Sequence, residues 1–232
     1  MGGLIRAYRL RYECLDLSGQ MEVVCHMSKF RLLLPGFFAV LAVSAVASAS
    51  ASALVYLVGN MEVLAGEKFL TLSEQKTGSN AVLKSTGANV QVTCTQTNDT
   101  GFIEPNGLSS ALILFSGCSV QKPNNTCVVQ EPIHIEVHDQ LVTEEGKTLD
   151  LFTPGSGTEF TKLHFTNCSL ETVEVTGAAR ASVEALTMQL KNTLKFLNNA
   201  PSGLLNAAGS NATFTLEEEV WLENDMNWGV ID

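Results

Sequence analysis

The sequence contains few basic residues: 14 Lys and Arg stand against 24 Asp and Glu, which gives a formal net charge of −10 at pH 7. After residue 53 the imbalance is larger, with 9 basic residues against 21 acidic ones. An acidic surface repels phosphate backbones and anionic lipid headgroups. We therefore expect no nucleic-acid partner and no binding to anionic membranes, and we interpret the acidity as a source of solubility outside the cell.

Common catalytic and cofactor-binding motifs are missing as well. The sequence contains no G-x-S-x-G nucleophile turn and no glycine-rich phosphate loop between a strand and a helix. Its cysteine spacings include no C-x2-C or C-x4-C pair of the kind that holds zinc. These absences favour a protein without a cofactor and disfavour an enzyme.

No apolar run is long enough to span a membrane. Strongly apolar residues extend from Leu32 to about Val46, which is short of the roughly 20 residues that a spanning helix needs. A basic stretch at 29–31 precedes the run, and small residues, mainly Ala and Ser, follow it to Ala53. This order is typical of a secretory signal peptide, and we predict a signal helix within 27–53, cleaved after Ala53. The mature protein should be secreted or cell-surface, without a stable membrane anchor.

Residues 1–26 precede a signal that is already complete from Met27. We interpret them either as an over-extended gene start, with Met27 the true initiator, or as a long n-region of the signal peptide. Both interpretations leave the export prediction unchanged. Both also place a single β-rich extracytoplasmic domain at 54–232.

Four of the six cysteines follow the predicted cleavage site: Cys94, Cys118, Cys127 and Cys168. An even number of cysteines in an exported chain indicates two disulfides, because the destination is oxidising. Three pairings are possible. We favour Cys118 with Cys127, because the Pro- and Asn-rich turn between them folds the chain back locally, and Cys94 with Cys168.

Apolar residues make up 45% of the chain, enough to build a core, and after residue 53 they mostly alternate with polar ones. A period of two indicates strands with one packed face and one wet face. Turn sequences such as NDTG, EPNG and EEGK separate these segments. About ten short strands predict an all-β, mainly antiparallel sandwich or barrel. The expected strands are 61–65, 81–86, 89–95, 110–118, 134–142, 148–152, 159–166, 171–177 and 212–224.

Two segments depart from this simple pattern. In 212–224 the apolar residues fall on one face, except that Glu218 occupies one of the apolar positions. We nevertheless interpret the acidic run 217–219 as a solvated face. In 183–197, leucines recur at three- and four-residue steps, which fits an amphipathic helix, while the Thr and Phe residues also permit a strand. Both assignments of 183–197 stay open.

A series of short turn and cysteine patterns follows in a fixed order: Gly-Glu at 66–67, Val-Thr-Cys at 92–94, Phe-Ser-Gly-Cys at 115–118, Cys127, Phe-Thr-Pro at 152–154, Cys168 and Trp-Gly at 228–229. In this order the chain resembles a group of uncharacterised exported four-cysteine proteins of actinobacteria. The resemblance covers most of the mature chain and implies a compact β domain. It implies no known activity and offers no catalytic residue to carry over.

The sharpest candidate for chemistry is the segment 133–139, Ile-His-Ile-Glu-Val-His-Asp. On a strand, His134, Glu136 and His138 project from one face. Two imidazoles and a carboxylate could hold a metal with an open position. Successive residues on one face lie about 6.5–7 Å apart, however, so all three reach one ion only if the strand bends. We therefore favour a strand with a water-exposed polar face.

The sequence thus favours an exported, non-enzymatic binding or surface module, whose ligand could be a protein, a glycan or a small molecule. One alternative is a secreted hydrolase or metal-dependent enzyme centred on His134, Glu136 and His138. Another is a carrier of a small apolar ligand, since β-barrels with apolar interiors hold such molecules. A closed barrel with an internal cavity would favour the carrier, and a filled sandwich the surface module.

Overall fold

The computed structural model describes residues 54–183, 188–196 and 204–231. Nearly all of these residues belong to antiparallel strands, which confirms the predicted all-β class. Among them, the only helical element is a short 3-10 turn, η1, at Pro105–Gly107, so no helix is long and apolar enough to cross a membrane. The predicted signal peptide and residues 1–26 lie outside the described residues.

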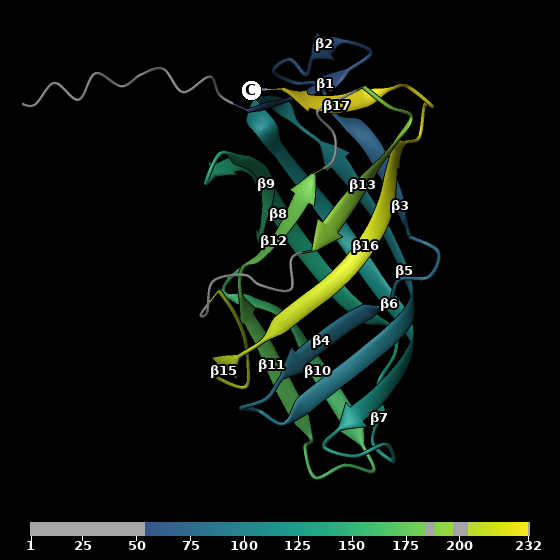
Figure 1. The fold of residues 1–232 in the computed structure, drawn as a ribbon, viewed down its shortest axis with the longest axis vertical. Helices are drawn as coiled ribbons and strands as arrows, with labels where there is room; N and C mark the ends of the chain where they lie inside the picture. The colour runs from purple at the N-terminus through teal and green to yellow at the C-terminus, as the bar shows by residue number, and fades with distance from the viewer. Residues whose placement is uncertain (1–53, 184–187, 197–203, 232) are drawn as a thin grey trace, which may run out of the picture. The chain divides into compact units, whose positions relative to one another are not determined.

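Eight strands close into a barrel in which each strand pairs with a neighbour on either side (Figure 1). In order around the barrel they are β3 (Phe69–Gln75), β5 (Val90–Ile103), β6 (Leu108–Lys122), β8 (Ile133–Glu144), β9 (Lys147–Pro154), β12 (Ala179–Val183), β13 (Lys191–Phe196) and β16 (Thr213–Leu222). The pairing of β13 with β16 closes the ring. β4 (Ala81–Ser85) pairs with both β5 and β16 beyond the end of β3. Of the two predicted architectures, a sandwich and a barrel, the structure is a barrel.

A three-stranded sheet packs against the interior of the barrel at one end. Its strands are β17 (Trp228–Ile231), β1 (Val55–Val58) and β2 (Met61–Glu62). Tyr56 and Trp228 of this sheet share a buried cluster with Ile103, Leu141 and Leu222 of the barrel. The two aromatic side chains of this sheet therefore pack against the apolar residues at this end of the barrel.

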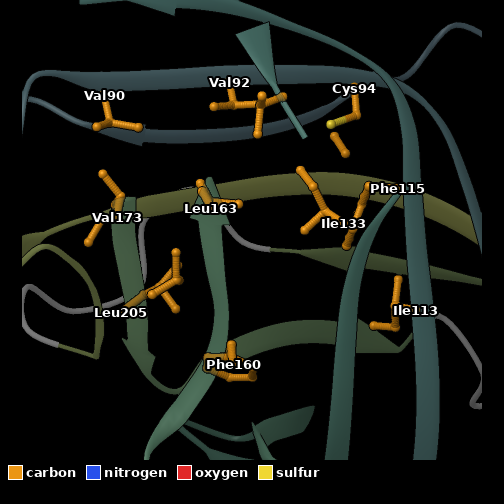
Figure 2. Close-up of a cluster of buried hydrophobic side chains, with 14 of the residues drawn as sticks. Val90, Val92, Cys94, Ile113, Phe115, Ile133, Phe160, Leu163, Val173 and Leu205 are labelled. Atoms are coloured by element: carbon orange, nitrogen blue, oxygen red, sulfur yellow. The ribbon is translucent and has the colours of Figure 1, made fainter. Parts of the chain in front are cut away.

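A five-stranded sheet contributes to a second and larger core cluster. Its strands are β15 (Ser210–Asn211), β14 (Leu205–Ala207), β11 (Thr172–Gly177), β10 (Glu159–Thr166) and β7 (Val128–Val129). Phe160 and Leu163 of this sheet belong to the same buried cluster as Ile113, Phe115 and Ile133 of the barrel (Figure 2). The barrel and this sheet therefore share one hydrophobic core.

Alternation of residue type decides which face of each barrel strand points inward. Along β8, Ile133, Val137 and Leu141 are buried, while the residues between them on the opposite face are exposed. The hairpin from β8 to β9 turns at Glu145 and Gly146, which both have positive φ angles, of 50° and 72°. Two successive positive φ angles are what a two-residue turn needs to match the twist of the strands. The predicted turn EEGK is confirmed.

The sequence NDTG, at 98–101, was predicted as a turn and lies instead inside β5. There the chain is paired on both sides, with β3 and with β6, so long-range hydrogen bonds outweigh the local turn preference. Gly101 allows the close packing of these strands, because a Cβ at this position would lie 2.3 Å from the carbonyl oxygen of Ser110. The turn prediction is wrong for NDTG, and Asp99 lies in the middle of a strand.

Most of the described residues of 183–197 belong to strands β12 and β13. β12 ends at Val183 and pairs with β13, and β13 pairs in turn with β16. The residues of β13 therefore form a strand that is paired on both sides, and the helical alternative is wrong for them. Among the leucines that suggested a helix, Leu190 precedes β13 and is exposed, whereas Leu194 is packed against the core.

Two disulfides are present, as predicted, but the predicted pairs are wrong. Cys94 bonds to Cys118 with a Cα–Cα distance of 3.9 Å, and Cys127 bonds to Cys168 with a distance of 4.6 Å. Cys94 and Cys118 lie directly opposite each other on β5 and β6. Cys127 precedes β7, which pairs with the end of β10, and Cys168 follows that end. The Pro- and Asn-rich turn that follows β6 therefore brings Cys127 and β7 beside β10, and it does not bring Cys127 back to Cys118.

Candidate functional site

His134, Glu136 and His138 lie in a row on the exposed face of β8. Along this stretch β8 pairs without interruption with β6, so the strand lacks the bend that would bring the three side chains to one ion. His164 lies on β10, where its Nδ1 atom is 3.2 Å from Thr172 Oγ1. Among the residues that the structure describes, no three His, Cys, Asp or Glu side chains are arranged as a metal site. The structure therefore does not assemble the candidate metal ligands.

A cavity of about 70 Å³, which we call the apolar cavity, is lined by residues of the barrel, of β4 and of the five-stranded sheet. Apart from Thr161, all the residues that line it are apolar. Phe152 and Phe196 lie at its wall with ring centroids 4.9 Å apart, and Phe214 packs edge-on against Phe196 at 5.1 Å. Figure 2 shows part of the lining, including Ile113, Phe115, Ile133, Phe160 and Leu163, gathered between the strands.

A second cavity, of about 50 Å³, is lined by carboxyl groups and aromatic rings from the barrel and the three-stranded sheet. We call it the acidic cavity. Its carboxyl groups come from three barrel strands and its aromatic rings from β1, β9 and β17. The side chains concerned are Asp99, Asp139, Asp150, Tyr56, Phe152 and Trp228. A charged, desolvated lining of this kind is typical of binding sites and not of filled cores.

Asp139 and Asp150 form a closed ring of contacts with two hydroxyl groups. The Tyr56 hydroxyl donates to Asp150 Oδ2 at 3.2 Å and lies 3.1 Å from Ser109 Oγ. The Ser109 hydroxyl donates to Asp139 Oδ2. The two carboxyl groups lie close enough for each to act on the pKa of the other. Two acidic groups therefore meet at this point, and a hydroxyl group donates to each of them.

Glu218 adds a fourth carboxyl group to this region. It is completely buried on the inner face of β16, where it contacts Asp99, and neither of its carboxylate oxygens has a hydrogen-bond donor. The interpretation of 217–219 as a solvated face is therefore wrong at its centre, because the alternation of β16 turns that residue inward. Glu217 and Glu219 remain partly exposed and form ion pairs with lysines of β13.

Burial raises the pKa of all four carboxyl groups. The pKa of Asp99 and that of Asp139 are each raised to about 6, chiefly because burial disfavours the charged form. The pKa values of Asp150 and Glu218 are raised well above the ordinary range by burial and by the neighbouring carboxylates. Burial and the charge of Asp150 also raise the pKa of Tyr56.

No lysine or arginine among the described residues acts on the pKa of these four carboxyl groups. The single positive charge that does so is that of His138, which lowers the pKa of Asp139 from the outer face of β8. The nearest strand with an arginine is β12, and its Arg180 pairs with Glu144 at 2.7 Å. The acidic cavity therefore has no countercharge within the described part of the chain.

Comparisons of the chain with family models, with curated proteins and with solved structures each find no match. The site is therefore interpreted from its own residues. Sequence reasoning missed Asp99, Asp139 and Asp150. The alternation of apolar and polar residues could have indicated two of them. Asp139 occupies an inward-facing position of β8, in line with Val137 and Leu141, and Asp150 occupies an inward-facing position of β9.

Proposed function

We propose that this chain is a non-enzymatic, extracytoplasmic binding module whose barrel holds a small apolar ligand. The observation that carries the proposal is the apolar cavity in the core that the barrel shares with the five-stranded sheet, since apolar cavities of β-barrel proteins are typical binding sites. The β-rich fold with two disulfides is compatible with a protein outside the cell. Export itself rests on the predicted signal peptide.

The volume of the apolar cavity limits what it can hold. A dry cavity of about 150 Å³ lined by aliphatic and aromatic side chains binds benzene or xenon. The cavity in this barrel has about half that volume, about 70 Å³. The proposed ligand is therefore a molecule of a few carbon atoms, or the apolar end of a larger one. A long-chain lipid would require displacement of the phenylalanines that line the wall.

A hydrolase or metal-dependent enzyme centred on His134, Glu136 and His138 has less support. The three side chains are exposed in a row on a regularly paired strand, whereas the apolar and the acidic cavity are lined by residues of the opposite face of β8. We also propose that nucleic acids and anionic membranes are not partners, on the ground of the net charge of −10. The resemblance to exported actinobacterial proteins stays a prediction.

Benzene and xenon are suitable probes of the apolar cavity. We expect benzene to raise the melting temperature in a concentration-dependent way, and xenon to shift the methyl resonances of the lining residues. Ala81→Val would add volume to the wall of the cavity and should reduce both effects, because Ala81 is buried there. Thr143→Val, at an exposed position near the end of β8, is the matched control and should change neither. If neither probe has any effect on the unaltered protein, the proposal is wrong.

A further inference from the structure

We infer that the acidic cavity binds the ammonium group of a small organic amine, whose hydrocarbon part lies in the apolar cavity. The inference rests on the proposed function, because it names the charge and the class of the ligand that the barrel holds. It combines three observations: carboxylate oxygens without partners, aromatic walls, and a side chain shared by the two cavities.

Carboxylate oxygens without partners face the acidic cavity. Asp139 and Asp150 are 7% and 4% exposed and both line the cavity, and the Oδ1 atom of each has no hydrogen-bond partner. A buried charge without a partner is strongly unfavourable, and a buried polar atom without a hydrogen bond is rare in native proteins. An ammonium group carries N–H donors and a positive charge, and so would satisfy both oxygens at once.

Three aromatic rings form part of the wall of the acidic cavity, and aliphatic side chains form much of the rest. Tyr56 and Trp228 are inclined at 55° with their ring centroids 6.3 Å apart, and Phe152 lies on the same cavity. The face of an aromatic ring attracts a cation within about 6 Å of its centre, and this attraction is strongest where water is excluded. Carboxylates on one side and aromatic faces on the other are the features that recognise organic ammonium ions.

These features favour an organic cation over a metal ion. Divalent cations require several oxygen or nitrogen ligands at short distance, and no such group of His, Cys, Asp or Glu is arranged around a point in the described residues. An aromatic ring face is not a ligand for calcium or zinc. The volume of about 50 Å³ exceeds the roughly 30 Å³ that one water occupies in the liquid, which leaves room for an ammonium group and the carbon attached to it.

Phe152 connects the acidic cavity with the apolar one. It lines both, and it packs against Phe196 on the apolar side. Phe152 lies between the two cavities, so a ligand with its ammonium group beside Asp139 and Asp150 reaches the apolar cavity if the Phe152 side chain moves aside. A short alkylamine has this combination of charge and size, and its neutral alcohol analogue has the size without the charge.

The test is calorimetric titration of the full mature chain with butylammonium and with 1-butanol, at pH 7.5. This pH lies above the pKa of about 6 of Asp139, so this group is ionised, and the positive charge of a bound amine favours ionisation of Asp150 beside it. We expect butylammonium to bind at least tenfold more tightly than 1-butanol. Equal affinity for the amine and the alcohol would overturn the inference.

Variants separate this inference from the proposed function. Asp139→Asn with Asp150→Asn should abolish the preference for the amine and leave benzene binding in the apolar cavity unchanged. Glu136→Gln, on the exposed face of the same strand as Asp139, is the matched control and should keep the preference. Urea unfolding of each variant checks that it is folded.

Two further outcomes are decisive. If benzene binds and no amine does, the ammonium site is wrong and the apolar ligand proposal survives. If butylammonium binds with the predicted variant effects and benzene does not bind, the ammonium site is supported and the apolar cavity is not the ligand site. Tight binding of Ca²⁺, Mg²⁺ or Zn²⁺ that is lost in the Asp139→Asn/Asp150→Asn protein, with no amine preference, would replace the amine by a metal ion and overturn the inference.

Discussion

Asp139 and Asp150 occupy diagonal positions on the paired strands β8 and β9, and each acts on the pKa of the other. Directly across the ladder, Asp139 faces Phe152 and Asp150 faces Leu141. Diagonal neighbours on one face of a sheet are close enough for their side chains to meet. The ladder fixes the spacing of the two backbone positions, so the strand pairing keeps these two acidic side chains close to each other. Their closeness contributes to the raised pKa of Asp150.

The stability of the protein should fall as the pH rises from about 4 to about 7. Asp99 and Asp139 have a pKa of about 6 in the folded protein, which is above the ordinary value of about 3.9, so the folded state binds their protons more tightly than the unfolded state does. Their contribution is complete below pH 4 and is lost as the pH passes through 6. It is on the order of 3 kcal/mol for each group.

Urea unfolding between pH 4.5 and 7.5 measures this effect. The Asp139→Asn/Asp150→Asn protein should show a flatter pH dependence, because two of the groups with raised pKa values are gone. A free energy of unfolding that stays constant or increases across this range in the unaltered protein would contradict the prediction.

Glu218→Gln should stabilise the protein at pH 7.5 by about 1–3 kcal/mol. Glu218 is 0% exposed and its pKa is raised well above the ordinary range, so folding at this pH requires either a buried charge or the uptake of a proton. The amide has the same shape and neither cost. The gain should shrink at pH 4.5, where the carboxyl group of the unfolded chain is already about half protonated.

Glu219→Gln is the matched control for this substitution. Glu219 is the next residue of β16, is partly exposed, and lies 3.5 Å from Lys191, so its replacement should change the stability by no more than about 0.5 kcal/mol. Chemical unfolding of both variants at the two pH values gives the comparison. Equal effects of the two substitutions would show that Glu218 is not buried as described.

Loss of either disulfide should destabilise the protein to a similar extent. Cys94–Cys118 spans 24 residues and Cys127–Cys168 spans 41, and the chain-entropy relation gives about 3.5 and about 4 kcal/mol for loops of these lengths. The measurement is urea unfolding of the two double Cys→Ala variants. Peptide mapping without reduction checks the pairs, and a peptide that joins Cys94 to Cys168 would contradict the structure.

Replacement of both His134 and His138 by Gln should change the stability by no more than about 0.5 kcal/mol, because both side chains are exposed on β8. Zinc should leave the melting temperature unchanged, since no metal-binding arrangement surrounds these residues. Thermal unfolding with and without zinc is the measurement. A zinc-dependent rise in melting temperature that disappears in the double variant would bring back the metal hypothesis.

The fold class could be predicted from the sequence because the alternation of apolar and polar residues is a local property. The strands with the clearest alternation, such as 134–142 and 159–166, were found within a few residues of their true ends. Pairing is not local. The disulfide partners depend on which strands lie side by side, and neither the return of β7 to β10 nor the closure by β13 and β16 leaves a mark in the nearby sequence.

The acidic cavity could have been found in part. Glu218 interrupts the apolar face of its strand, and Asp139 does the same on β8, so a carboxyl group at an apolar position was the available signal. Its meaning depends on closure of the barrel, because only closure brings these side chains, which are far apart in the chain, around one space. Asp99 gave no such signal, since NDTG favours a turn when it is considered alone.

The strand that closes the barrel, β16, comes near the end of the described chain and pairs with β3, β4 and β13. Until β16 is in place, β3 and β13 each keep an unpaired edge, and contacts between distant parts of a chain are slow to form. Consecutive strands such as β5, β6, β8 and β9 can pair earlier, but the barrel cannot close before β16 has been synthesised. If residues 27–53 act as the predicted signal peptide, closure of the barrel and formation of its two disulfides should follow export.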